Sequence, residues 1–139
     1  MEWTEYKVLH SETIMFYQVI ENDLKTIYAF MQDGDIDENY ASVSTLTLGQ
    51  IIDRLKNLEN TRNKRVLEKQ DYNFLNQIKD NRNFWAHANF LEFIYDDDFE
   101  HTENYKKQCR KLQKDHDRVE QVYAIIEQKR VSFCTHAKR

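Results

Sequence analysis

The chain of 139 residues contains no proline, only two glycines and only two cysteines. Few breaks therefore interrupt its regular structure, whereas a protein made of short strands needs frequent turn residues. Cys109 and Cys134 are too few for the disulfide framework of a small secreted domain. No apolar run is long enough to span a membrane, and none follows a basic start as in a signal peptide. We therefore expect an all-α, cytoplasmic protein that has no contact with a membrane.

Charge is abundant but unevenly distributed. The formal net charge of −4 argues against a protein that coats nucleic acid in general. Between Arg54 and Arg82, however, eight Lys and Arg residues stand against four Asp and Glu, which reverses the sign locally. Such a region can attract RNA through its phosphates. The candidate contacts are Arg62, Lys64, Arg65 and Lys79, although the residues around position 64 also fit a solvated connection between two helices.

Apolar spacing predicts two helices in the first half of the chain. The first runs from about Trp3 to Gln32, and a polar, acidic loop is expected from Asp35 to Thr45. The sequence Thr47-x-x-Gln50 has the form of a capping box, in which two side chains and two backbone amides bond reciprocally at a helix start. It predicts that the second helix begins there.

A third helix is predicted from about Asp71 to Tyr95, with apolar residues on two sides. One stripe consists of Phe74, Ile78, Trp85 and Ala88, and the other of Phe84, Leu91 and Tyr95. A helix that is apolar nearly all round is buried on both sides. Two interpretations stay open: the helix lies at the centre of a monomer, or a second protomer covers one side. We favour a homodimer formed through this helix.

The last part of the chain predicts a fourth helix that begins at Asp96-Asp97-Asp98, where acidic side chains favour the positive helix start. Apolar residues then alternate four and three apart, and His116 falls in this seam as a hydrogen-bonded core histidine. A run of cations indicates a solvated face or a second phosphate-binding strip: Lys106, Lys107, Arg110, Lys111 and Lys114. The tail, 131–139, is expected to fray. Residues 1–139 thus form one domain, an antiparallel up-down bundle of four or five helices.

The most informative stretch carries Arg82, Asn83 and His87 within an otherwise apolar run. On an α-helix, Asn83 and His87 lie one turn apart on the same face, so the amide can orient the imidazole. Arg82 lies about 140° round the helix from His87 at 100° per residue. The guanidinium must therefore reach round the helix, or a second copy of the chain must supply it.

Arg82-Asn83 followed by three apolar residues and His87 resembles the R-x4-H signature of the HEPN domain family. That resemblance implies a dimer of four- or five-helix bundles in which two motifs face one another. It also implies a metal-independent endoribonuclease of the kind found in toxin–antitoxin and phage-defence systems, with a possible antitoxin protein as partner. In related toxins a Tyr commonly follows the His by two residues and is modified. Here Asn89 occupies that position, so regulation by this modification is not expected.

The chemistry that these residues suit is cleavage of RNA without a metal or another cofactor. A histidine that titrates near neutrality can act as general acid or base, and an arginine can stabilise phosphoryl oxygens. Because the attacking group is the 2′-hydroxyl of RNA, DNA is not a substrate. No P-loop, H-E-x-x-H or C-x-x-C motif is present, and no set of metal ligands is expected to converge. The alternative is a catalytically inactive HEPN-like bundle that binds a nucleotide or a protein partner as a regulatory or scaffold subunit.

Overall fold

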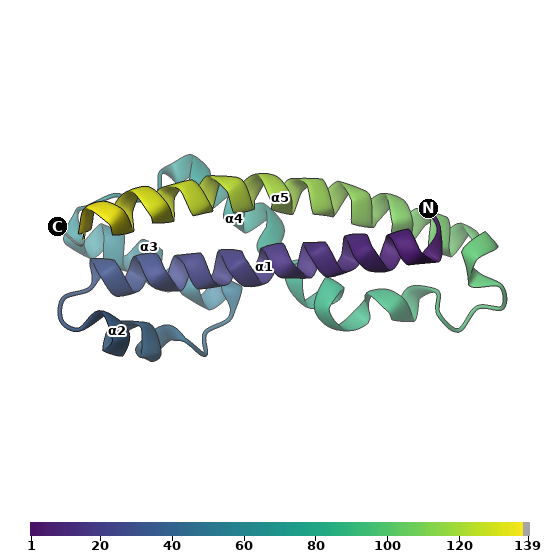
Figure 1. Ribbon diagram of the computed structural model, residues 1–139, viewed down its shortest axis with the longest axis horizontal. Coiled ribbons are helices and arrows are strands. Elements are labelled where there is room, and N and C mark those ends of the chain that lie inside the picture. Colours follow the sequence, from purple (N-terminus) through teal and green to yellow (C-terminus); the bar gives the residue numbers. More distant parts are fainter. Residues whose placement is uncertain (138–139) are drawn as a thin grey trace.

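The computed structural model describes residues 1–137, and all of its regular elements within that range are helical (Figure 1). The α-helices are α1 (Trp3–Met31), α2 (Ile36–Val43), α3 (Leu48–Arg62), α4 (Lys69–Lys79) and α5 (Glu103–Ala137). Three short helical segments connect α4 to α5: the π-helix η1 (Phe84–Ala88) and the 3₁₀-helices η2 (Asn89–Glu92) and η3 (Phe99–His101). No described helix is long and apolar enough to cross a membrane.

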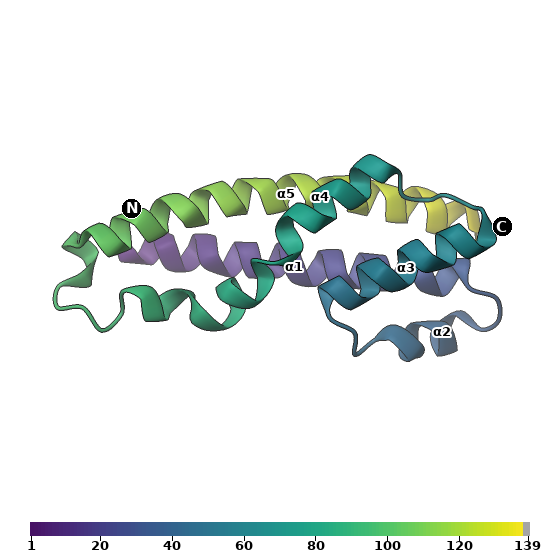
Figure 2. The same ribbon diagram turned by 180° about the vertical axis from the view of Figure 1, so that it is seen from behind.

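Successive arms of the chain alternate in direction, as an up-down bundle requires. From α4 through η2 the chain runs along α1 in the opposite direction. Two contacts show this: the Tyr17 hydroxyl donates to the Ile78 carbonyl, and the Tyr6 hydroxyl donates to Asn89. Helix α5 then runs beside α1 in the same direction as α1 (Figures 1 and 2). The two longest helices, α1 and α5, thus form one layer. Helices α3 and α4 and the short segments cover one face of this layer.

The first and second predicted helices are confirmed. Helix α1 ends one residue before the predicted limit, and α3 begins at the predicted capping box. There the Gln50 amide donates to the Thr47 hydroxyl over 3.3 Å and the Thr47 amide to the Gln50 side chain over 3.0 Å. The reciprocal bonds satisfy two amides that a helix start otherwise leaves without partners.

The predicted loop from Asp35 to Thr45 is wrong, because most of it forms α2. The Asp35 side chain caps this helix by accepting from the Glu38 amide over 3.0 Å. At its other end Val43 is fully buried, and Lys25 of α1 donates to the Ser44 carbonyl. The acidic residues that indicated a loop in fact favour the helix. Asp35 caps its start, and Asp37 and Glu38 place negative charge in its first turn.

The single third helix predicted from Asp71 to Tyr95 is also wrong. Helix α4 ends at Lys79, and the chain continues through a turn into η1 and η2. Neither glycine nor proline causes this break. Instead, the Tyr17 hydroxyl bonds to the Ile78 carbonyl over 2.8 Å, so a distant side chain takes part in ending α4.

Two expectations for the last helix need correction. Asp96, Asp97 and Asp98 do not cap it, because α5 begins only at Glu103, where the Thr102 hydroxyl accepts from the Tyr105 amide. The tail that was expected to fray is helical as far as Ala137, although Lys138 and Arg139 lie outside the described residues. The seam itself faces the core: Tyr105, Cys109, Leu112, His116, Val119 and Ile126 are buried, whereas Tyr123, also predicted in this seam, is half-buried.

A buried carboxylate holds the connection between α3 and α4. Glu59 is 1% exposed and accepts from the amides of Val66 (2.9 Å) and Leu67 (3.3 Å) and from the Tyr72 hydroxyl. Burial together with this carboxylate raises the pKa of the Tyr72 phenol. Glu59 thus accepts from three donors, two of which are buried.

Replacing Glu59 with alanine is expected to lower the free energy of unfolding by about 3 kcal/mol, since three donors, two of them buried, lose their acceptor. Urea denaturation of Glu59→Ala measures this change. Asp53→Ala is the matched control, because it removes the same charge from an exposed position on the same helix. Equal stabilities of the two variants would show that this network contributes nothing to the fold.

Candidate active site

The predicted motif lies where α4 passes into η1, and one tryptophan anchors it to the bundle. Trp85 is fully buried, and its indole N–H donates to the Asp115 carboxylate of α5 over 2.8 Å. A buried indole that is also hydrogen-bonded holds its backbone in one place. The position of η1 relative to α5 is therefore fixed two residues before His87.

The carbonyl of Trp85 explains why this segment leaves the α-helical form. It accepts from the Asn89 amide group over 2.9 Å and from His10 Nε2 over 2.6 Å. A carbonyl can only accept, so the His10 ring carries its proton on Nε2. Side chains thus occupy an acceptor that a regular α-helix would pair with a backbone amide. The Tyr6 hydroxyl completes the cluster by donating to Asn89 Oδ1 over 2.9 Å.

The π-helix changes the geometry predicted for the motif. Its hydrogen bonds join residues five apart rather than four, so it turns less per residue than an α-helix. Arg82 and His87 are five apart, and η1 covers most of the interval between them. The angle that separates them is therefore smaller than an unbroken α-helix would give. π-helical turns occur frequently at functional sites for this kind of reason.

His87 and Asn83 are both exposed, and no hydrogen bond joins them in the described part of the chain. The predicted orientation of the imidazole by Asn83 is therefore not formed. The competing interpretation, in which His87 is a buried structural ring, is wrong as well. The buried amide beside a histidine is instead Asn89, which is 1% exposed and lies 3.1 Å from the His10 ring.

Arg82 is held by an acidic residue of α1. Its Nε lies 2.8 Å from Glu21 Oε1, and the two side chains are 28% and 12% exposed. A partly buried ion pair of this kind fixes the guanidinium more firmly than a fully exposed pair would. Glu21, which the sequence pattern did not single out, is therefore the residue that positions Arg82.

Of the four predicted phosphate contacts, only Lys79 lies beside the motif. With Arg82 and Asn83 it lines a hollow of about 350 Å³ next to the start of α3. Arg62 is paired with Asp33 at 3.0 Å at the other end of α3, and Lys64 and Arg65 line a separate hollow there. Because α3 has 15 residues, its ends are about 20 Å apart at 1.5 Å per residue. These three residues therefore do not join the candidate site.

A basic groove on the other side of the motif contains four of the five cations in the predicted run of α5, all except Lys106. Lys111 Nζ lies 3.8 Å from the centre of the Phe84 ring, a cation–π contact between α5 and η1. The groove has a volume of about 530 Å³ and is lined by Phe84, Glu92, Asn104, Lys107, Gln108, Arg110, Lys111 and Lys114. Cations beside an aromatic ring are features that bind single-stranded nucleic acid.

Two large apolar side chains are exposed just after the motif. Leu91 is 61% exposed and Tyr95 is 83% exposed. They belong to the second of the two predicted apolar stripes, whereas Phe84, also in that stripe, is half-buried beneath Lys111. His87 is thus followed along the chain by apolar surface that this chain does not cover.

Comparisons with protein-family models, curated proteins and solved structures found no match to this chain. The resemblance to HEPN domains therefore depends on the R-x4-H pattern and on the all-helical structure.

Proposed function

We propose that the protein is a metal-independent endoribonuclease of HEPN type and acts as a dimer. The observation that supports this best is the contrast within the motif: Trp85 and Asn89 are buried, whereas His87 between them is exposed. No hydrogen bond within the described chain engages the His87 ring. A histidine without a hydrogen bond in the described chain, five residues after an arginine that an ion pair fixes, is suited to proton transfer to or from a ligand.

In the proposed reaction the 2′-hydroxyl of RNA attacks the adjacent phosphorus. A histidine takes the proton of that hydroxyl, the bond from phosphorus to the 5′-oxygen breaks, and an acid protonates the leaving oxygen. Two copies of His87 in a symmetric dimer supply the base and the acid. Arg82 stabilises the negative charge on the phosphoryl oxygens. The products are a 2′,3′-cyclic phosphate and a 5′-hydroxyl.

Cleavage products test this chemistry directly. The purified protein is expected to cut single-stranded RNA in the presence of EDTA and to leave DNA of the same sequence intact, because DNA lacks the 2′-hydroxyl. Labelling with polynucleotide kinase without prior phosphatase should succeed, since the new ends carry 5′-hydroxyl groups. Cleaved DNA or 5′-phosphate ends would overturn the mechanism. RNA that stays intact while a nucleotide binds would favour the inactive, regulatory alternative.

Dimer formation is expected at micromolar concentration, because pairing would cover the exposed Leu91 and Tyr95 and bring two motifs together. Analytical ultracentrifugation of the full chain measures this. Leu91→Asp should shift the population to the monomer and lower cleavage. Val8→Asp is the matched control, since it places the same charge at an equally exposed apolar position on α1 (63%). A wild-type monomer at these concentrations would contradict the dimer.

A further inference from the structure

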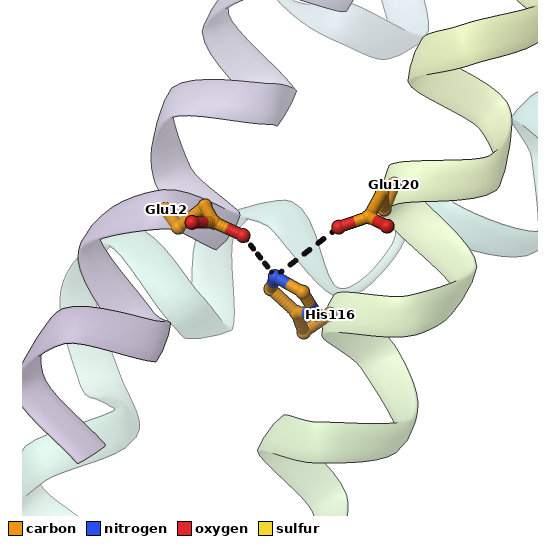
Figure 3. A group of neighbouring side chains, drawn as sticks. All are labelled: Glu12, His116 and Glu120. Atoms are coloured by element: carbon orange, nitrogen blue, oxygen red, sulfur yellow. Dashed lines mark hydrogen bonds and ion pairs between the residues drawn. The ribbon is translucent and has the colours of Figure 1, made fainter. Parts of the chain in front are cut away.

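A second group of side chains with chemical potential lies between α1 and α5 and shares no residue with the motif. Glu12 of α1 and Glu120 of α5 both direct a carboxylate oxygen at Nε2 of His116 (Figure 3). Glu12 Oε1 lies 2.6 Å from this nitrogen and Glu120 Oε2 lies 3.7 Å from it. The three atoms all lie within 4.8 Å of one another.

His116 is held as a metal-binding histidine usually is. Its side chain is 8% exposed, and its second ring nitrogen, Nδ1, lies 3.0 Å from Asp117 Oδ1. A carboxylate on the far nitrogen of an imidazole fixes the ring and increases the basicity of the nitrogen that binds the ion. Burial lowers the pKa of His116, but the carboxylates of Asp117, Glu12 and Glu120 together raise it above the usual value. An ionised carboxylate can only accept, so in the 2.6 Å contact with Glu12 the Nε2 atom carries a proton where an ion would bind.

The spacing of the three atoms suits a small ion. In a tetrahedral zinc site with bonds of about 2.1 Å, neighbouring ligand atoms are about 3.4 Å apart. The two separations from Nε2, 2.6 and 3.7 Å, lie on either side of this value, and the two carboxylate oxygens lie within 4.8 Å of each other. The Glu12 and Glu120 side chains are 44% and 54% exposed, so they can adjust without disturbing the core.

We propose that Glu12, His116 and Glu120 form a Zn²⁺ site that joins α1 to α5 and leaves a fourth position open to water. One imidazole nitrogen with two carboxylate oxygens is a donor set that Zn²⁺ accepts, whereas Mg²⁺ and Ca²⁺ prefer oxygen donors alone. The ion replaces the proton on Nε2 and neutralises two carboxylates that otherwise face each other across the helix pair. This proposal is independent of the ribonuclease activity.

The sequence pattern did not reveal this cluster, although the structure brings three side chains together that could hold an ion. His116 and Glu120 are four apart on α5, which is a common spacing for two ligands on one helix face. Glu12 is 104 residues away from His116 in the sequence, and only the parallel packing of α1 and α5 brings it to the same nitrogen. One amino-acid sequence contains no sign that Glu12 and His116 come into contact.

Titration of the full-length protein with Co²⁺, a spectroscopic substitute for Zn²⁺, tests the site. One equivalent is expected to give the visible absorption bands of a four-coordinate ion, and Zn²⁺ should remove them. Glu12→Gln and Glu120→Gln should each weaken binding at least about tenfold, and Asp117→Asn by about tenfold through the ring. Glu100→Gln is the matched control, because it removes an exposed carboxylate outside the cluster and should leave binding unchanged.

Thermal unfolding gives a second readout. Zn²⁺ should raise the unfolding temperature of the wild-type protein, because an ion that binds only the folded state stabilises it. It should not raise that of the Glu12→Gln, Glu120→Gln double variant. Both residues are exposed, so the variant is expected to fold, and circular dichroism checks this. Absence of one-equivalent binding by the wild type, or equal affinity in the double variant, would overturn the site.

Discussion

Replacing His87 with alanine is expected to lower the rate of RNA cleavage by roughly 10²-fold or more, the usual contribution of a general acid or base. Arg82→Ala should lower it by a similar factor, since it removes the cation that stabilises the phosphoryl charge. Single-turnover cleavage of a labelled RNA measures both rates. The unfolding free energy of His87→Ala should hardly change, because the side chain is exposed and makes no hydrogen bond within the described chain.

Two matched variants make this result specific. His101→Ala removes another exposed histidine, 79% exposed on η3, and should leave cleavage unchanged. Glu21→Gln loosens the ion pair to Arg82 but keeps the guanidinium, so its effect should be smaller than that of Arg82→Ala. Cleavage that persists in both His87→Ala and Arg82→Ala would place the active site elsewhere. A loss of activity that follows loss of folding would show that these residues are structural.

The proposed zinc site does not weaken the test of metal independence. EDTA removes Zn²⁺ and could change stability, but the Glu12→Gln, Glu120→Gln double variant has lost the site already. This variant should therefore cleave RNA at the wild-type rate with or without EDTA at a temperature where it is folded. Failure of the ribonuclease proposal would leave the Co²⁺ titration unaffected, and absence of the zinc site would leave the cleavage products unaffected.

The features that could be predicted from the sequence depend on short-range patterns. The extent of α1 follows from its apolar spacing, and the start of α3 follows from Thr47 and Gln50, whose side chains act within one helical turn. The seam of α5 and the burial of His116 follow from regular spacing in the same way. Each of these signals needs no knowledge of what lies across the core.

The features that could not be predicted depend on contacts between distant parts of the chain. The helix predicted from Asp71 to Tyr95 is broken because side chains bond to its backbone carbonyls, which a continuous helix would pair with backbone amides. These side chains belong to Tyr17, Asn89 and His10. Helical periodicity from Asp71 to Tyr95 carries no information about those donors. In the same way, local charge placed Arg62 with Lys79 in one candidate site, whereas the length of α3 separates them.

Trp85→Ala is expected to lower the free energy of unfolding by about 3–5 kcal/mol, because it removes a fully buried aromatic side chain and leaves a cavity. It also deprives the Asp115 carboxylate of the indole N–H that lies 2.8 Å away. Chemical denaturation measures the loss, and hydrogen exchange should show faster exchange in η1 than in α1.

Phe84→Ala is the matched control for that variant, because it truncates the neighbouring aromatic ring, which is only half-buried and contacts Lys111 at the surface. Its loss of stability should be clearly smaller, since less apolar area leaves the core. At a temperature where it is folded, Trp85→Ala should also cleave RNA more slowly than the wild-type protein, because His87 is two residues from the lost anchor. Equal stability of the two variants would show that Trp85 does not anchor η1. The exposure of His87 would then need another cause.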